Sequence, residues 1–132
     1  MDMAQTVTRD LFQTLAERMK LNGEQKRAAA ELILLNPDLL VAQYKNSQAL
    51  STEAEQYAKD GNLLVAENRY ASAVKLALHE GNPDPAREYL EKCVKLDLTH
   101  NFAYKTALKD FDTISQCILE FYKSKSGGVP NP

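Results

Sequence analysis

The stretch from Asn68 to His100, NRYASAVKLALHEGNPDPAREYLEKCVKLDLTH, decides the fold of this chain. Apolar residues recur at steps of three and four on both sides of a single polar break, HEGNPDP, at residues 79–85. Such spacing is typical of amphipathic helices, and glycine and proline in the break are helix stop and start signals. The stretch therefore predicts two helices that are joined by a short turn and folded against each other.

The same pattern extends over the rest of the 132-residue chain, because its few glycines and prolines fall between periodic segments. The spacing predicts about seven helices, with approximate bounds 8–21, 24–35, 37–46, 52–67, 68–80, 84–96 and 99–123. No segment alternates apolar and polar residues for long enough to indicate a strand. Since every connection is short, neighbouring helices should be antiparallel, and we expect an all-α fold.

Three helix starts carry side chains that are favoured as N-caps. We expect caps at Asn36, at Ser51 or Thr52, and at Asp84, since each precedes an apolar periodic segment. The helical part is expected to form a single domain over residues 1–123, of a size that can bury its own core. The tail at 124–132, SKSGGVPNP, is expected to be flexible.

Composition and charge exclude several classes of protein. The hydrophobic content of 44% and charged content of 26% are ordinary for a globular protein, and the net charge of −2 lacks the basic excess of a nucleic-acid-binding domain. No apolar run reaches the roughly 20 residues of a membrane helix, and the polar N-terminus does not resemble a signal peptide. Cys93 and Cys117 lack CxxC spacing, which favours free thiols in a reducing compartment. We therefore expect a cytoplasmic protein that binds neither membrane nor, as its main ligand, nucleic acid.

One segment has the length of a known helical repeat. Residues 67–100 span 34 positions, the period of the tetratricopeptide repeat, and the segment resembles that family. Tyr70 matches the first aromatic position of the family pattern and Ala86 its signature alanine, although Leu98 replaces the usual proline. One period later, Tyr104 and Phe111 match the two aromatic positions of a following repeat.

A second register also fits the family pattern, with a repeat over 54–74 that keeps Gly61 inside its first helix. In either register the resemblance covers about residues 52–122, and residues 1–50 would be a degenerate repeat or capping helices. The resemblance implies antiparallel helical hairpins stacked as a short superhelix. The alternative is an irregular helical bundle.

The sequence contains no motif that indicates catalysis, a metal or a cofactor. His79 and His100 are the only histidines, and neither belongs to a zinc-binding HExxH motif. Nucleophile-elbow, P-loop and dinucleotide-binding motifs are also missing. We therefore expect a non-catalytic module for protein–protein interaction, a scaffold without a cofactor.

In the tetratricopeptide family the first helix of each hairpin lines a concave groove, which is where a peptide or partner protein would bind. The resemblance implies that this groove is lined by Asn68, Lys75, His79, Phe102, Lys105 and Lys109. Ala71 and Leu78 would face the same way. Lysines favour an acidic peptide or a C-terminal carboxylate, because hydrogen bonds between ionised groups are the strong ones.

Two other functions remain open. A small helical hydrolase or nuclease would need His79, Glu80 and Arg87 to converge in one cleft. A self-associating bundle would form a homodimer through the last helix, whose exposed apolar face would carry Tyr104, Phe111, Ile118 and Phe121.

Overall fold

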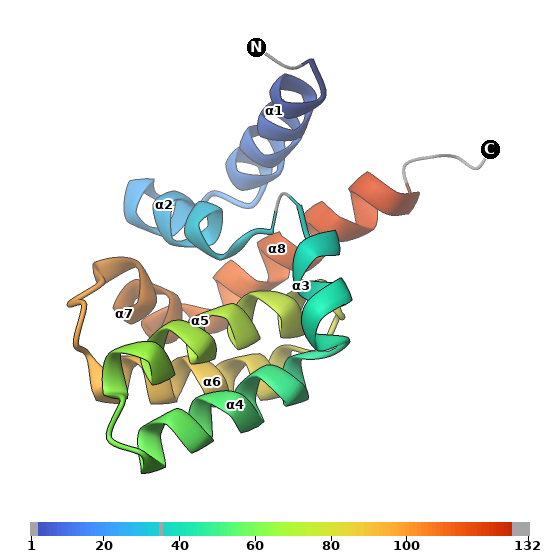
Figure 1. Ribbon diagram of the computed structural model, residues 1–132. Coiled ribbons are helices and arrows are strands. Elements are labelled where there is room, and N and C mark those ends of the chain that lie inside the picture. The colour runs from blue at the N-terminus through green and yellow to red at the C-terminus, as the bar shows by residue number, and fades with distance from the viewer. Residues whose placement is uncertain (1–2, 35, 128–132) are drawn as a thin grey trace.

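A computed structural model describes residues 3–34 and 36–127, and in these residues it confirms the predicted all-α fold (Figure 1). The described backbone forms helices and no strand. The helices are α1 (Met3–Arg18), α2 (Gly23–Leu32), α3 (Asp38–Tyr44), α4 (Ser47–Lys59), α5 (Leu63–His79), α6 (Pro83–Leu96), α7 (Phe102–Lys109) and α8 (Phe111–Gly127).

Helices α4 and α6 pack on α5, and each is joined to it by a short turn, so that both run antiparallel to it (Figure 1). The two turns have the same design, with Gly61 at φ +82° and Gly81 at φ +81°. The next amide closes each turn: Asn62 donates to the Tyr57 carbonyl at 2.8 Å, and Asn82 donates to the carbonyl five residues before it at 2.9 Å. Glycine ends a helix in this way because the left-handed conformation costs it nothing.

The turn at Gly61 corrects the predicted helix over 52–67. Leu64 and Val65 continue the apolar spacing of α4, but they belong to α5, which begins at Leu63. The expected break near Asn68 is therefore wrong, and Gly61 lies in a turn, not inside a helix as the second repeat register expects. A left-handed glycine cannot continue an α-helix, so the chain reverses there.

Helix α5 is the centre of this three-helix layer. Its buried residues include four alanines, Ala66, Ala71, Ala73 and Ala77. Small side chains let the axes of α4 and α6 approach α5 closely. An ion pair of 2.7 Å between Arg69 Nε and Glu53 Oε1 also joins α5 to α4.

The first two helices cover the C-terminal part of the chain. Helix α1 packs on α8, and α2 packs on α7 and α8. The rings of Phe12 and Phe121 meet edge to face at 6.3 Å, and the Tyr122 hydroxyl accepts a hydrogen bond of 2.7 Å from the Leu34 amide. Phe111 and Ile118 are buried in the same core. The apolar face that was expected to be exposed for a homodimer is therefore covered within one chain, because α1 and α2 supply its packing partners.

The last predicted helix, 99–123, is two helices in the structure. The backbone at Asp110 has φ −110° and ψ 38°, which interrupts the helical direction between α7 and α8. The break lets α7 pack on α2 and α6 while α8 packs on α1, α2 and α5. The Asp110 carboxylate accepts a hydrogen bond of 3.1 Å from the Gln25 side chain, which joins the break to α2. Helix α8 then continues to Gly127, beyond the predicted end at 123, and the rest of the expected flexible tail lies outside the described residues.

The three expected N-caps are all wrong by a few residues. The cap of α4 is Asn46, which accepts a hydrogen bond from the Ala49 amide at 2.9 Å, so Ser51 and Thr52 lie inside the helix. At α6 the N-cap is Asn82, which makes no side-chain cap hydrogen bond, and Pro83 is the first helical residue. At α3 the N-cap position is Pro37, which has no side chain that can cap. Proline fits a helix start because its fixed φ is helical and the missing amide has no partner there.

Candidate functional site

A groove with a cavity volume of about 750 Å³ lies between α4 and α6, with α5 behind it. One wall contains Gln48, Thr52 and Glu55 of α4, which recur at helical steps on one face. The opposite wall contains Glu88 and Lys92 of α6, one helical turn apart. Because both helices are antiparallel to α5, they run in the same direction along the groove.

The floor of the groove is aromatic. Tyr70 of α5 lines it and is only 4% exposed. The Lys92 ammonium lies 5.5 Å from the centroid of the Tyr70 ring, within the range of a cation–π interaction. A cation therefore rests on the groove floor.

One end of the groove is held in place by a carboxylate. Glu80, at the end of α5, accepts hydrogen bonds from the Ser47 amide at 3.0 Å and the Ser47 hydroxyl at 2.6 Å. This carboxylate satisfies an otherwise free amide in the first turn of α4. The end of the groove is therefore set by contacts that do not need a ligand.

The walls expose polar groups that the fold does not use. In the part of the chain that the structure describes, the side chains of Gln48, Thr52 and Glu88 take part in no hydrogen bond or ion pair. Glu55 only approaches Lys59, at 3.9 Å, and both side chains are exposed, which makes a weak pair. These groups are available to a ligand.

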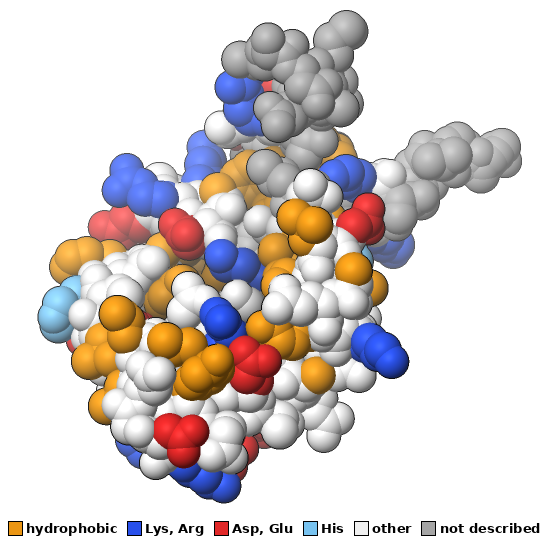
Figure 2. Space-filling model, in the orientation of Figure 1, with side chains coloured by type: hydrophobic (Ala, Val, Ile, Leu, Met, Phe, Trp, Pro, Cys, Tyr) orange, Lys and Arg blue, Asp and Glu red, His pale blue; other side chains and the backbone are white. Residues whose placement is uncertain are grey.

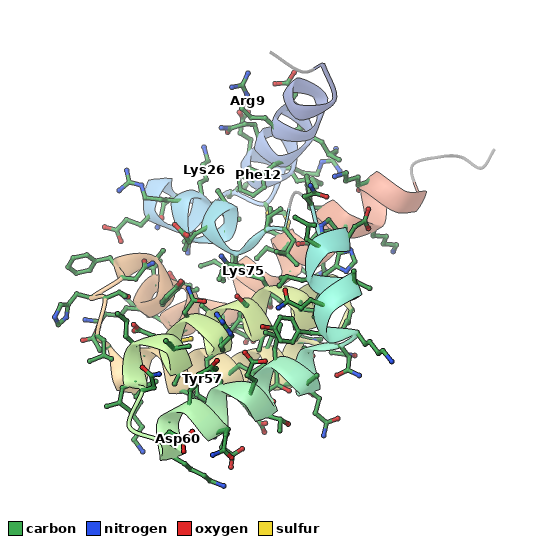
Figure 3. The ribbon with its side chains drawn as sticks, viewed as in Figure 1. Arg9, Phe12, Lys26, Tyr57, Asp60 and Lys75 are labelled. Carbon is green, nitrogen blue, oxygen red and sulfur yellow. The ribbon has the colours of Figure 1, made fainter. Side chains whose placement is uncertain are left out.

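The predicted groove residues lie elsewhere, on two helices. On α5, the Asn68 side chain accepts a hydrogen bond from Arg69 at 2.9 Å, Lys75 lies between α2 and α5, and the His79 ring packs edge to face on Tyr122 at 5.0 Å (Figure 3). The main packing partners of α5 are α4, α6 and α8, whereas those of α7 are α2, α6 and α8. The structure thus places the two halves of the predicted groove on helices that are not a closely packed pair.

The α7 half of the predicted groove is mostly at the surface. Phe102 is 79% exposed and Lys109 is exposed, while the Lys105 ammonium forms an ion pair of 3.1 Å with Asp97. Two other positions that were expected to face the groove, Ala71 and Leu78, are buried in the core of α5.

The residues of the enzyme hypothesis have separate partners. His79 contacts Tyr122, Glu80 binds Ser47, and the Arg87 guanidinium lies 3.5 Å from the Asp112 carboxylate. These contacts point to different neighbours, so the described structure does not gather them in one cleft. The described residues also contain no group of three His, Cys, Asp or Glu side chains that could hold a metal ion.

Several exposed apolar residues lie towards one end of the molecule, while Leu39 and Val41 are exposed on α3. Leu63 and Leu64 begin α5, and Leu98 lies in the segment that leads from α6 to Phe102 of α7. Figure 2 shows hydrophobic side chains over this end, at the left of the view. Exposed apolar side chains such as these are an ordinary feature of protein surfaces unless they form a large patch.

The groove residues were missed because α4 was expected to run through Gly61. The repeated tripeptides Asp60-Gly61-Asn62 and Glu80-Gly81-Asn82 are the signal that could have revealed two equivalent turns. Two such turns, one at each end of α5, make α4 and α6 run in the same direction along α5, and the groove lies between them.

The chain has no significant match among models of protein families, curated proteins or solved structures. Among the described helices, none combines the length and apolar character that crossing a membrane requires.

Proposed function

We propose that the protein is a non-catalytic interaction module that binds an extended segment of a partner protein in the groove between α4 and α6. The observation that carries this proposal is the groove itself, an open volume of about 750 Å³ between two helices that run the same way. Its floor is aromatic, and Gln48, Thr52 and Glu88 on its walls are unused by the fold. Clefts with a few convergent polar groups are the usual places where ligands bind.

The resemblance to tetratricopeptide repeats supports the same groove. In that family the first helix of each hairpin lines the binding surface. If α4 and α5 are taken as one hairpin, α6 is the first helix of the next, so α4 and α6 hold the two lining positions. The groove lining on α4 runs from Ser47 to Glu55, a length of about 12 Å, which accommodates about four extended residues.

The proposal includes a cytoplasmic location, which the two free cysteines support, since both are buried as thiols. It does not include the homodimer, because Phe111, Ile118 and Phe121 lie in the core. It also moves the partner away from Lys75, Lys105 and Lys109, because the structure does not bring these lysines together in a groove.

The test is binding to an array of random octapeptides by the full chain and by two double variants. Thr52→Arg with Glu88→Arg places bulky charge on both walls of the groove. Ala49→Arg with Glu91→Arg makes the same change of charge at exposed positions of the same two helices that do not line the groove. Circular dichroism and light scattering check that each variant is folded and monodisperse.

We expect the parent and the control variant to select the same peptides and the groove variant to lose them. Equal selection by all three proteins would show that peptides bind elsewhere. If the folded parent selected no peptide at all, the interaction function itself would be rejected.

A further inference from the structure

One positively charged side chain of the protein, that of Lys92, lies in the groove. The Lys92 ammonium lies over the buried ring of Tyr70, at 5.5 Å from its centroid. Lys92 is exposed, so its long side chain reaches the floor from the wall of α6 and has solvent on its other side. An ammonium group on a flexible four-carbon chain changes its position easily.

Negative charge surrounds this cation. The charged side chains that line the groove are three glutamates, Glu55, Glu80 and Glu88, and one lysine, Lys92. Glu80 is held by Ser47, but Glu88 has no ion-pair or hydrogen-bond partner within the described residues. Glu88 also precedes Lys92 by one helical turn, so that both side chains lie on the same face of α6. The lining therefore favours positive charge at the place that Lys92 occupies.

We propose that Lys92 is an internal placeholder for the side chain of an arginine or lysine in the bound segment. This inference rests on the proposed function of the groove. The cation of the partner takes the place over Tyr70, between Glu55 and Glu88 on the two walls. The Lys92 side chain then rotates into solvent. Aromatic rings bind guanidinium and ammonium groups through their negative face, and carboxylates nearby strengthen the attraction.

Charge complementarity selects this occupant over an acidic one. A carboxylate in the groove would gain one contact with Lys92 and would meet Glu55 and Glu88 as like charges. A cation would exchange places with Lys92 at little cost and keep both glutamates. The partner is therefore a basic segment, not the acidic peptide that the lysines of α5 and α7 suggest.

The test is a titration of the full-length protein followed by ¹⁵N–¹H NMR. The probes are three blocked peptides, Ala-Ser-Ala-X-Ala-Ser-Ala, in which X is arginine, glutamine or glutamate. Lys92→Ala removes the placeholder, Lys92→Arg replaces it with a cation that stacks more strongly, and Glu88→Gln removes one carboxylate. Lys95→Ala is the matched control, since Lys95 is exposed on α6 outside the groove lining.

We expect the arginine peptide to shift the amide signals of Thr52, Tyr70 and Glu88 and to bind Lys92→Ala about tenfold more tightly than the parent. Lys92→Arg and Glu88→Gln should bind it more weakly, and Lys95→Ala should resemble the parent. If Lys92→Ala instead weakened binding and the glutamate peptide bound best, Lys92 would be an anchor for an anion; that result overturns the inference and leaves the groove as a binding site. If the array peptides shift the groove signals but the arginine peptide does not, the inference is likewise overturned and the groove remains a binding site. If no peptide shifts the groove signals in the parent or in Lys92→Ala, both the inference and the proposed function are wrong.

Discussion

The carboxylate of Glu67 accepts a hydrogen bond of 3.1 Å from the backbone amide of Leu98. Its second oxygen accepts one of the same length from the amide of Thr99. Glu67 is only 2% exposed, so a buried charge of α5 holds the segment between α6 and α7. That segment contains Asp97 and His100, at φ 46° and φ 50°, a left-handed conformation that is uncommon for residues other than glycine. The hydrogen bonds to Glu67 hold the backbone between these two residues.

Replacing Glu67 with glutamine should lower the free energy of unfolding by about 2 kcal/mol, because a glutamine amide can accept from only one of the two N–H groups. Urea denaturation measures the change. Glu91→Gln is the control, since Glu91 is exposed and carries no such bond. If the two variants had equal stability, the carboxylate of Glu67 would not be what holds this segment.

Replacing a turn glycine with alanine should lower stability, whereas replacing the glycine that starts α2 should not. Nothing lies within 4 Å of a β-carbon added at Gly81, so Gly81→Ala costs only the strain of a positive φ, about 1 kcal/mol. Gly23 begins α2 without a positive φ and with the same open space, so Gly23→Ala should be neutral or stabilising by about 0.5 kcal/mol. Thermal unfolding of both variants measures the difference. A Gly81→Ala protein as stable as the parent would contradict the turn described above.

The covering of α8 by the N-terminal helices also has a measurable consequence. Phe121 is fully buried against Phe12, and Phe121→Ala should lower the free energy of unfolding by about 3–5 kcal/mol through the lost contacts and the cavity. Phe102→Ala, at an exposed ring, should change it by less than about 0.5 kcal/mol. A small effect at Phe121 would mean that α1 and α2 do not seal this face.

Stability should decrease at alkaline pH through a buried tyrosine. Burial raises the pKa of Tyr122 to about 12, above its value of about 10 in an unfolded chain. The folded state therefore holds the phenolic proton more tightly, and this contribution is complete below pH 10 and is lost as the pH rises towards 12.

Tyr122→Phe should cost about 1 kcal/mol at pH 7, because the Leu34 amide loses its acceptor, and it should make the alkaline loss smaller. A part of the loss should persist, since burial also raises the pKa of Tyr104 to about 12. The measurement is urea denaturation at pH 7 and about pH 11. The same alkaline loss in parent and variant would show that Tyr122 does not titrate with unfolding.

The cysteines should react only when the protein opens. Burial raises the pKa of the Cys93 thiol to about 12 and also raises that of Cys117, so both remain protonated at pH 8. Mass spectrometry after treatment with iodoacetamide should show alkylation in urea and almost none in buffer. Fast alkylation of Cys93 in buffer would contradict its burial between α5 and α6.

Periodicity and punctuation in the sequence were enough to predict where most helices occur, and the turn at Gly81 was recognised directly. Gly61 was not recognised as a turn, because an isolated glycine within an apolar period is tolerated in a helix at a cost of only about 1 kcal/mol. The break at Asp110 was missed for a similar reason: Ala107, Phe111 and Ile114 keep helical spacing across it. At Gly61 and at Asp110, the direction that the chain takes depends on packing against other helices.

The candidate site depended still more on tertiary structure. The sequence alone indicated lysines on α5 and α7, since these follow one another in a repeat register. In the structure, α4 and α6 both pack on α5, and this places Thr52 opposite the wall that carries Glu88. Nothing in the local pattern of either helix predicts that they share a groove.

By itself, the sequence determined that this protein is all helical and built of short antiparallel neighbours, because helix formation depends on a local period and on turn residues such as Gly81. Which helix faces are buried and which are exposed depends on packing between helices that are distant in sequence. The apolar side chains of Phe121 and its neighbours could form either a dimer interface or a core. Packing against α1 and α2 buries them in the core. Likewise, a polar stripe on α4 becomes one wall of a groove only when α6 supplies the other, because burial and cavities depend on residues that are distant in sequence.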